Sequence, residues 1–194
     1  MMQFKQLQSD LEFQLYQDGF SKEYSRLTAL PSTPIPLDYL QRSSVVGLFN
    51  SSGKMVAGYI INGEAPFRLF DFVPPHSREN LTPPFQLSWS NVAEVTCVWK
   101  SREVSSIFMS LCFWPRVHWA VFTSGKKALL GHDQNKRLDQ FYTWAHPKTL
   151  YSGVSSSGLP SHLFAYYKPQ LLFCIAMLIL VETPRRTLKR VIKR

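Results

Sequence analysis

The sequence predicts a mixed α/β fold in which helices flank a largely antiparallel central sheet. Two β-rich runs, residues 44–49 and 55–62, are separated by the turn Asn50-Ser51-Ser52-Gly53, a pattern typical of an antiparallel hairpin. Residues 92–99 form a nearly continuous apolar run, as expected of a buried central strand. Predicted strands and helices alternate after this run. A chain of 194 residues is long enough to bury the core of one such domain.

The composition excludes several classes of protein. Apolar residues make up 45% of the chain and charged residues 18%, which excludes a disordered chain and a coiled coil. No run approaches the roughly 20 consecutive apolar residues that a membrane-spanning helix needs. The thiols of Cys97, Cys112 and Cys174 lie among apolar residues, so we expect buried, reduced cysteines. The N-terminus lacks a secretory pattern, and we therefore expect a cytoplasmic protein.

The N-terminal part of the chain predicts helices, a loop and a hairpin, in that order. Apolar residues at helical spacing predict a helix over residues 3–27, which Gly19 is expected to interrupt; they are Phe4, Leu7, Leu11 and Leu15. Prolines 31, 34 and 36 predict an extended loop. In the second strand of the hairpin, Gly58 is expected to permit a close backbone approach. Residues 66–73 are interpreted as an edge strand.

The C-terminal part predicts alternating helices and strands. Pro115 is expected to end a helix over residues 104–114, and the pair His146-Pro147 to end a helix over residues 126–145. The pair His132-Asp133 would then lie at an exposed helix start, and the alternative is that the two residues form an orienting pair. The expected strands follow the β-branched and aromatic runs, at residues 92–99, 117–123, 149–154 and 163–167.

This order of elements resembles the GNAT superfamily of acyl-CoA-dependent N-acyltransferases. It is most similar to the branch that includes acyl-homoserine-lactone synthases and long-chain acyltransferases. The resemblance covers roughly Gln3–Tyr167, and the hairpin Val45–Ile61 is similar to the second and third strands of the family. It implies transfer of an acyl group from acyl-CoA or an acyl-carrier-protein thioester to a small-molecule amine. It also implies that no cofactor is tightly bound, because the thioester is a co-substrate.

A second similarity lies in Asn135–Tyr142, which resembles the last core helix of the family. In that helix an asparagine is followed seven residues later by a tyrosine, as Asn135 is followed by Tyr142 here. Two helical turns would place both residues on one face. The resemblance implies that Asn135 binds pantetheine or substrate and that Tyr142 protonates the departing thiolate. The alternative is a helix with a core tyrosine and a surface asparagine.

Glu94 is the second candidate catalytic residue. It is the only charged residue in the apolar run 92–99, and a carboxylate there is costly to desolvate unless it is paired. Such a group could accept the proton of the attacking amine as a general base. Two other interpretations remain open: a glutamate at the edge of the strand, or one that is ion-paired with Lys100 or Arg102.

The loop that follows this strand would meet the phosphates of the acyl carrier. The resemblance assigns this role to Lys100, Arg102, Ser105 and Ser106. Relatives use a glycine-rich loop whose backbone amides hold the pyrophosphate, whereas residues 100–106 contain no glycine. A non-catalytic relative of the same fold, acting as a membrane-associated binding or adaptor protein, is therefore the alternative function.

The sequence divides into a domain at 1–168 and a C-terminal segment at 169–194. Leu171–Val181 is apolar, and residues 182–194 carry six basic residues against Glu182. This pattern suits peripheral attachment to an anionic membrane surface through Leu171–Arg194. The alternative is a helix packed on the sheet with a solvated basic end. The sequence contains no recognisable nucleic-acid-binding module, and its five histidines lack the spacing of a metal site.

Overall fold

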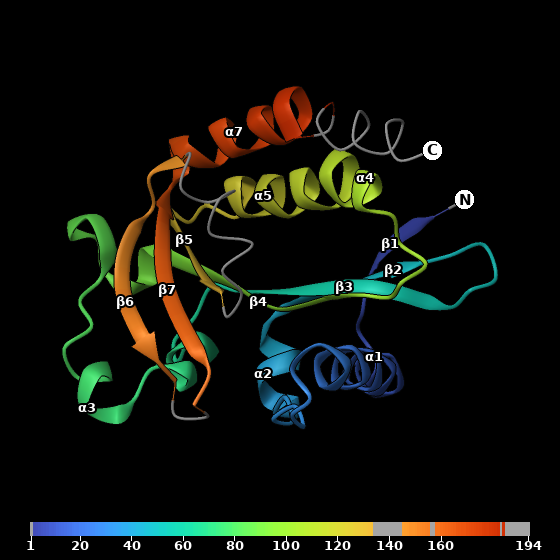
Figure 1. Cartoon of the computed structure of the whole chain (residues 1–194), viewed down its shortest axis with the longest axis horizontal. Helices are drawn as coiled ribbons and strands as arrows, with labels where there is room; N and C mark the ends of the chain where they lie inside the picture. The colour runs from blue at the N-terminus through green and yellow to red at the C-terminus, as the bar shows by residue number, and fades with distance from the viewer. Residues whose placement is uncertain (1, 134–144, 156–157, 183, 185–194) are drawn as a thin grey trace. The chain divides into compact units, whose positions relative to one another are not determined.

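One mixed sheet organises the protein, which is described here by a computed structural model of residues 2–133, 145–155, 158–182 and 184 (Figure 1). The strand order is β1-β2-β3-β4-β5-β7-β6. Strands β4 and β5 pair in parallel, whereas the pairs β1–β2, β2–β3, β5–β7 and β6–β7 are antiparallel. The strands are β1 (Gln3–Gln6), β2 (Ser44–Phe49), β3 (Met55–Asn62), β4 (Val92–Lys100), β5 (Ala128–Asp133), β6 (Lys148–Val154) and β7 (Pro160–Tyr167). The fold class expected from the sequence is confirmed.

Helices complete the architecture. The longer helices are α1 (Asp10–Thr28), α2 (Leu37–Arg42), α5 (Trp114–Thr123) and α7 (Lys168–Met177). The short ones are α3 (Pro75–Arg78) and α4 (Ser106–Phe108), the 3-10 helices η1 (Arg68–Phe72), η2 (Pro84–Gln86) and η3 (Trp89–Asn91), and the π-helices η4 (Met109–Phe113) and η6 (Leu178–Glu182). The chain forms two compact units, one of residues 1–62 and 95–105 and the other of residues 63–94 and 106–194.

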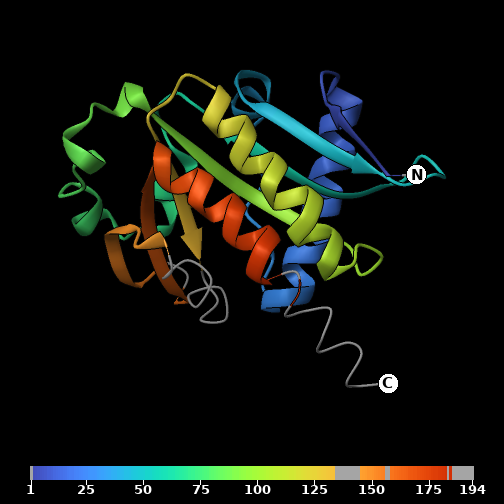
Figure 2. The same ribbon diagram turned by 90° about the horizontal axis from the view of Figure 1, so that it is seen from above.

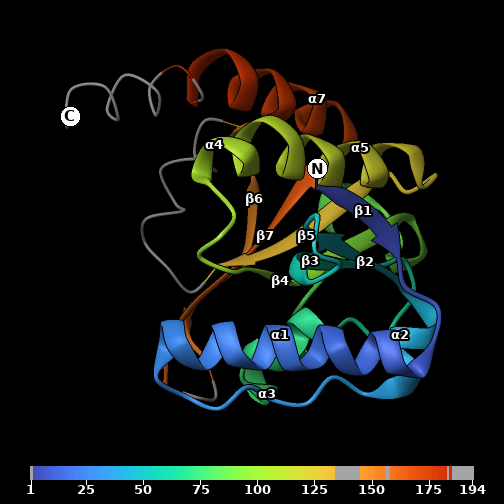
Figure 3. The ribbon, with the colours of Figure 1, turned by 90° about the vertical axis from the view of Figure 1, so that its right-hand side faces the viewer.

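In the first unit, α1 and α2 lie on the same face of the β2–β3 hairpin (Figures 1 and 3). Helix α1 is capped by Ser9, whose hydroxyl accepts the amide of Glu12 while the Glu12 carboxylate accepts the amide of Ser9. The expected start at residue 3 is wrong, because residues 3–6 form β1. The buried face of α1 consists of Phe13, Tyr16, Phe20 and Glu23.

Two glycines in this unit make room for aromatic rings. Gly19 does not interrupt α1, contrary to expectation; a Cβ there would lie 2.5 Å from the Trp99 ring, so glycine lets that ring pack against the helix. The close approach expected at Gly58 is confirmed, since a Cβ would lie 2.5 Å from the Tyr16 ring. The Tyr16 hydroxyl donates a 2.7 Å hydrogen bond to the carbonyl of Cys97, a residue with a φ of 50° inside β4.

In the second unit, α5 and α7 lie side by side on one face of β5 and β7 (Figures 1 and 2). The strand expected at 117–123 is wrong, because these residues belong to a helical run from Ser106 to Thr123. Burial there follows the helical period, at Val117, His118 and Val121. Pro115 does not end this run. The amide of Trp114 bonds the carbonyl of Met109 in a π-turn, which accommodates the missing donor of the proline.

The expected helix at 126–145 is wrong at its start, because residues 128–133 form β5. Ala128, Leu129 and Leu130 are buried and pair with β4 on one side and β7 on the other. The expected edge strand at 66–73 is also wrong, because residues 68–72 form η1. The strands expected at 92–99, 149–154 and 163–167 are confirmed by β4, β6 and β7.

The apolar segment 171–181 is helical, as α7 and η6. Among the described residues, no helix combines the length and the apolarity that crossing a bilayer requires. Cys97 and Cys174 are buried as expected, and burial raises the pKa of the Cys174 thiol to about 12. The expectation for Cys112 is wrong, because this thiol is exposed in η4.

Candidate functional site

The parallel pairing of β4 with β5 extends over only three residue pairs. Val92 faces Ala128, Ala93 faces Leu129, and Glu94 faces Leu130. Beyond Leu130, Gly131–Asp133 pairs with β7 on the other side. Glu94 is therefore the last β4 residue in the ladder. In the described part of the chain, the edge of β5 that faces away from β7 carries no ladder with β4 after this point.

Glu94 is completely buried, and both of its carboxylate oxygens accept backbone hydrogen bonds. Oε1 accepts the amide of Arg68 at 3.0 Å and Oε2 accepts the amide of Leu69 at 2.9 Å. These amides are the first two of η1, where a helical segment has unpaired N–H groups. Glu94 thus holds the 3-10 helix on the sheet and explains why residues 68–72 are not a strand.

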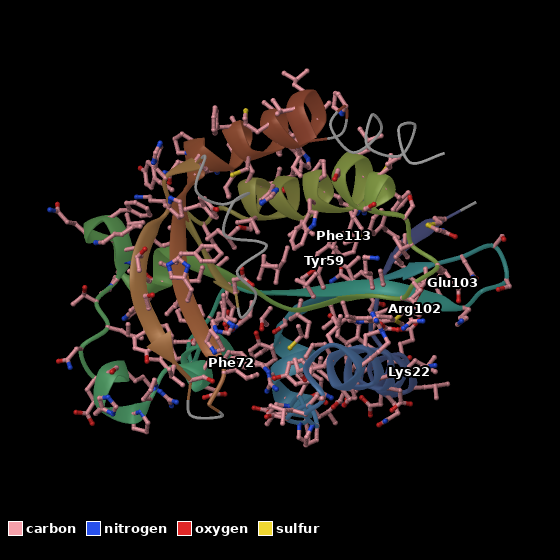
Figure 4. The ribbon with its side chains drawn as sticks, in the orientation of Figure 1. Lys22, Tyr59, Phe72, Arg102, Glu103 and Phe113 are labelled. Carbon is pink, nitrogen blue, oxygen red and sulfur yellow. The ribbon has the colours of Figure 1, made fainter. Side chains whose placement is uncertain are left out.

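His132 lies two residues beyond the end of the ladder and on the same face of the sheet as Leu130. Its ring stacks on that of Phe72, with 4.3 Å between the ring centroids (Figure 4 labels Phe72). Its Nε2 lies 2.9 Å from the hydroxyl of Ser161, and this hydroxyl donates to the carbonyl of Phe72 at 3.1 Å. Burial, with a smaller contribution from His162, lowers the pKa of His132 to about 4. His132 is therefore neutral at physiological pH.

The sequence interpretation does not identify His132 and Ser161 as a partly buried polar pair. It placed His132-Asp133 on a surface helix, whereas both residues belong to β5 and Asp133 is buried. The run Ala128-Leu129-Leu130 followed by Gly131 was the available signal for a short buried strand.

The loop after β4 belongs to the first unit and uses several of its own backbone amides. The amide of Ser101 donates to the carbonyl of Val56 at 2.7 Å, which continues the strand by one residue. The amide of Glu103 donates to the hydroxyl of Ser101, and the amide of Val104 donates to its carbonyl, both at 3.3 Å. This turn therefore differs from a glycine-rich phosphate loop, in which such amides point at the ligand.

The side chains expected to contact phosphate differ in their surroundings. The ammonium group of Lys100 donates to the carbonyl of Val104 at 3.0 Å and so ties down the loop. Arg102 and Ser105 are exposed, and Ser106 is exposed as the first residue of α4. Figure 4 labels Arg102 beside Glu103, whose carboxylate is ion-paired with Lys54. This ion pair, through its hydrogen bond, lowers the pKa of Glu103.

Asn135 and Tyr142 lie outside the described residues. Along the chain they fall between the end of β5 at Asp133 and the start of β6 at Lys148. Their assigned roles therefore stay predictions, as does the role of Glu94 as a base.

Comparison with known proteins identifies the fold. No protein-family model and no curated protein sequence matches this chain. Among solved structures, FeeM, an N-acyl amino acid synthase from uncultured soil microbes, is similar over 92% of this chain and 98% of its own, with a TM-score of 0.68 and 14% identity. TofI in an apo form is similar over 90% of this chain and 95% of its own, with a TM-score of 0.61 and 12% identity.

An N-acetyltransferase from Staphylococcus aureus Mu50 is similar over 87% of this chain and 99% of its own, with a TM-score of 0.58 and 13% identity. The chain thus shares the fold of these solved structures, which include an N-acyl amino acid synthase and an N-acetyltransferase, and this agrees with the fold that the sequence resemblance predicts.

Proposed function

We propose that this protein is an N-acyltransferase that moves an acyl group from a thioester, acyl-CoA or acyl-carrier protein, to a small-molecule amine. The observation that carries the proposal is the buried carboxylate of Glu94 at the point where β4 and β5 cease to pair. This feature occurs in a fold shared with an N-acyl amino acid synthase and an N-acetyltransferase. Function does not follow from fold alone, so the site has to carry the argument.

The edge of β5 after Leu130 suits an extended, amide-containing ligand. The acyl carrier's pantetheine arm has amide groups that could pair with backbone groups at a strand edge, as peptides do when they add to a sheet. In this proposal the thioester lies along Gly131–Asp133. The neutral side chain of His132 adds no positive charge to that edge.

The reaction forms a C–N bond and breaks a C–S bond, with one proton transfer at each step. The amine nitrogen attacks the thioester carbonyl, a C–N bond forms, and the nitrogen loses a proton to Glu94. The tetrahedral intermediate then collapses, the C–S bond breaks, and the thiolate takes a proton from the hydroxyl of Tyr142. The products are an amide and a free thiol, and solvent restores the protonation of both residues. The roles of Asn135 and Tyr142 rest on the sequence resemblance.

The carrier's phosphates would meet exposed side chains in place of a cradle of backbone amides. The exposed candidates for this contact are Arg102, Ser105 and Ser106. The Lys100 ammonium donates to the carbonyl of Val104 in the same loop. Contacts through flexible side chains hold a phosphate less rigidly than a cradle of amides does. A carrier protein would add its own protein–protein contacts, which makes it a reasonable alternative donor to free acyl-CoA.

We also propose that the reaction takes place in the cytoplasm, on the inner face of a membrane that the segment Leu171–Arg194 contacts. Long-chain acyl products partition into bilayers, because each buried methylene contributes about 0.8 kcal/mol. A synthase attached to the membrane surface would release such a product directly into its preferred phase.

The test measures thiol release from long-chain acyl-CoA and acyl-carrier protein in the presence of a panel of amines, with mass spectrometry of the amide product. We expect amine-dependent thiol release that Tyr142→Phe slows by about 10²–10⁴-fold, the usual contribution of a general acid. The matched control is Tyr167→Phe, on an exposed tyrosine, which should leave the rate unchanged. Absence of product with every donor and amine would refute the proposal and favour a non-catalytic adaptor.

A further inference from the structure

Helix α7 and the π-helix η6 that continues it have two apolar faces. The inner face is buried and consists of Leu171, Cys174 and Leu178, and α7 packs against α5. The outer face is exposed and consists of Leu172, Phe173, Ala176, Ile179 and Leu180. These five residues recur at i, i+1, i+4, i+7 and i+8, which places them along one side of a helix. Leu180 is 71% exposed.

A solvated surface helix normally turns polar residues outward. The outer face of α7 instead contains no polar side chain over two turns. Apolar patches of this kind on a protein surface indicate a binding partner or a membrane. The distribution of charge around this face decides between them.

The helices on this side of the second unit contain one acidic residue, Glu182, which is the last residue of η6. Neither residues 106–123 nor residues 168–181 include an aspartate or a glutamate. By contrast α1, which also has exposed leucines, carries four acidic residues, Asp10, Glu12, Asp18 and Glu23. The scarcity of acidic residues is therefore a property of these helices and not of the whole chain.

Basic residues lie beside the N-terminal end of α7 and follow η6 in the sequence. At its N-terminal end, the backbone amide of Lys168 donates to the carbonyl of Lys127 at 2.9 Å, so the two lysines are neighbours. The Lys168 ammonium lies 4.6 Å from the centroid of the Phe122 ring. After η6, residues 182–194 add six basic side chains against one acidic side chain. Long basic side chains next to an apolar face can extend to lipid phosphates while that face enters the bilayer interface.

We propose that the outer face of α7 docks on the surface of a bilayer that contains anionic lipids. The apolar side chains enter the boundary between headgroups and acyl chains, while Lys127 and Lys168 contact lipid phosphates. Residues 168–182 as a helix are about 22 Å long, so they lie along the surface instead of crossing it. This surface specifies the membrane contact of the proposed function, but it does not depend on acyl transfer, and its test needs no turnover.

A second copy of the chain fits this face less well than lipid does. The chain is basic beside the N-terminal end of α7 and after η6, so pairing two copies in either direction would bring like charges together. Anionic lipids neutralise the same charges, and each lysine or arginine near such a surface contributes about 1 kcal/mol to binding. The charge distribution therefore favours lipid.

The experiment is co-sedimentation of the full chain with two kinds of vesicle. One contains phosphatidylcholine alone, and the other also contains roughly 30 mol% phosphatidylglycerol, which gives the surface a negative charge. The test variant is Leu172→Gln/Phe173→Gln/Leu180→Gln, in which all three side chains are exposed. The matched control is Leu11→Gln/Leu15→Gln/Leu27→Gln, which removes three leucines from α1 that are at least as exposed as the three residues of the test variant. Size-exclusion chromatography and circular dichroism of each variant verify the oligomeric state and the fold.

We expect binding to the anionic vesicles, weakened by salt, that the α7 variant lowers at least about ten-fold and the α1 variant leaves unchanged. The pair Lys127→Gln/Lys168→Gln should lower the partition coefficient by roughly five-fold for each charge removed. Absence of binding to anionic vesicles would overturn the proposal. So would binding that the α7 variant does not weaken, or a dimer in the absence of lipid that the same variant converts to monomer.

Discussion

Substituting glutamine for Glu94 removes one acceptor from a buried site in which two backbone amides depend on one carboxylate. In the wild type, Oε1 and Oε2 accept the amides of Arg68 and Leu69 at 3.0 and 2.9 Å. The glutamine carbonyl can accept only one of these amides, and its NH₂ group then faces the other. The variant therefore loses one charge-assisted hydrogen bond and leaves a buried N–H without an acceptor.

The expected loss follows from the energies of these two effects. A hydrogen bond to a charged group contributes about 1.5–3 kcal/mol, and an unsatisfied buried donor costs about 1–3 kcal/mol. The two overlap in part, so Glu94→Gln should lower the free energy of unfolding by about 2–4 kcal/mol. For a chain of this size, each kcal/mol lowers the melting temperature by about 2–4 °C, which gives roughly 4–16 °C.

The assay is thermal and urea unfolding followed by circular dichroism. Glu103→Gln is the matched control, because this glutamate is solvent-exposed in the loop after β4, and its loss should leave the melting temperature unchanged. If Glu94→Gln were as stable as the wild type, the two amides would not depend on the carboxylate and the account of η1 would be refuted. Thiol release measured well below both melting temperatures separates any catalytic loss from the loss of stability.

Three further predictions test the packing and the ionisable groups. Gly58→Ala should destabilise the protein by about 1–3 kcal/mol in urea unfolding, because the new Cβ would overlap the Tyr16 ring; unchanged stability would contradict the packing described. Burial lowers the pKa of His118 to about 4, below its unfolded value near 6.5. The unfolded state then binds more protons between these values, so stability should fall by about 3 kcal/mol from pH 6.5 to pH 4, and less in His118→Gln. The hydrogen bond from Lys5, followed by the amides of Gln8 and Ser9, lowers the pKa of Glu12 to about 2. Its contribution to stability is present above pH 4.5 and lost as the pH falls from 4.5 to 2, so Glu12→Gln should flatten the acid limb of a stability–pH curve.

The sequence predicted those elements whose local pattern agrees with their final state. The hairpin has a turn in which the Asn50 side chain accepts the amides of Ser52 and Lys54, and Gly53 adopts a φ of 77°. Such a turn depends on neighbouring residues alone. The strands at β4, β6 and β7 were likewise visible as β-rich runs.

Tertiary contacts decided the elements that the sequence interpretation missed. The 3-10 helix η1 forms where the carboxylate of Glu94, 25 residues away from Leu69, accepts its first amides. Residues 117–123 have strand propensity, but they continue a helix that begins before Pro115 and passes the proline through a π-turn. The inner face of α1 was misjudged because Leu11 and Leu15 are exposed, while Phe13 and Tyr16 pack on the sheet. Helical spacing alone could not tell which of two apolar stripes would be buried.

The candidate site was predicted in part. The sequence indicated that Glu94 is a buried charge in a central strand, and the structure adds that it ends the β4–β5 ladder. The hydrogen bonds that occupy the amides of Glu103 and Val104 were not predictable, because they depend on how Ser101 folds back in the turn.

The most direct test of the central claim is the melting temperature of the purified protein with coenzyme A, long-chain acyl-CoA and acyl-carrier protein. A ligand that binds only the folded state stabilises it by about 2.7 kcal/mol at a hundredfold excess over its dissociation constant. For this chain, that corresponds to a rise of roughly 5–11 °C. The account predicts such a rise with at least one acyl thioester and a smaller one with the free thiol. An unchanged melting temperature with every thioester would contradict it.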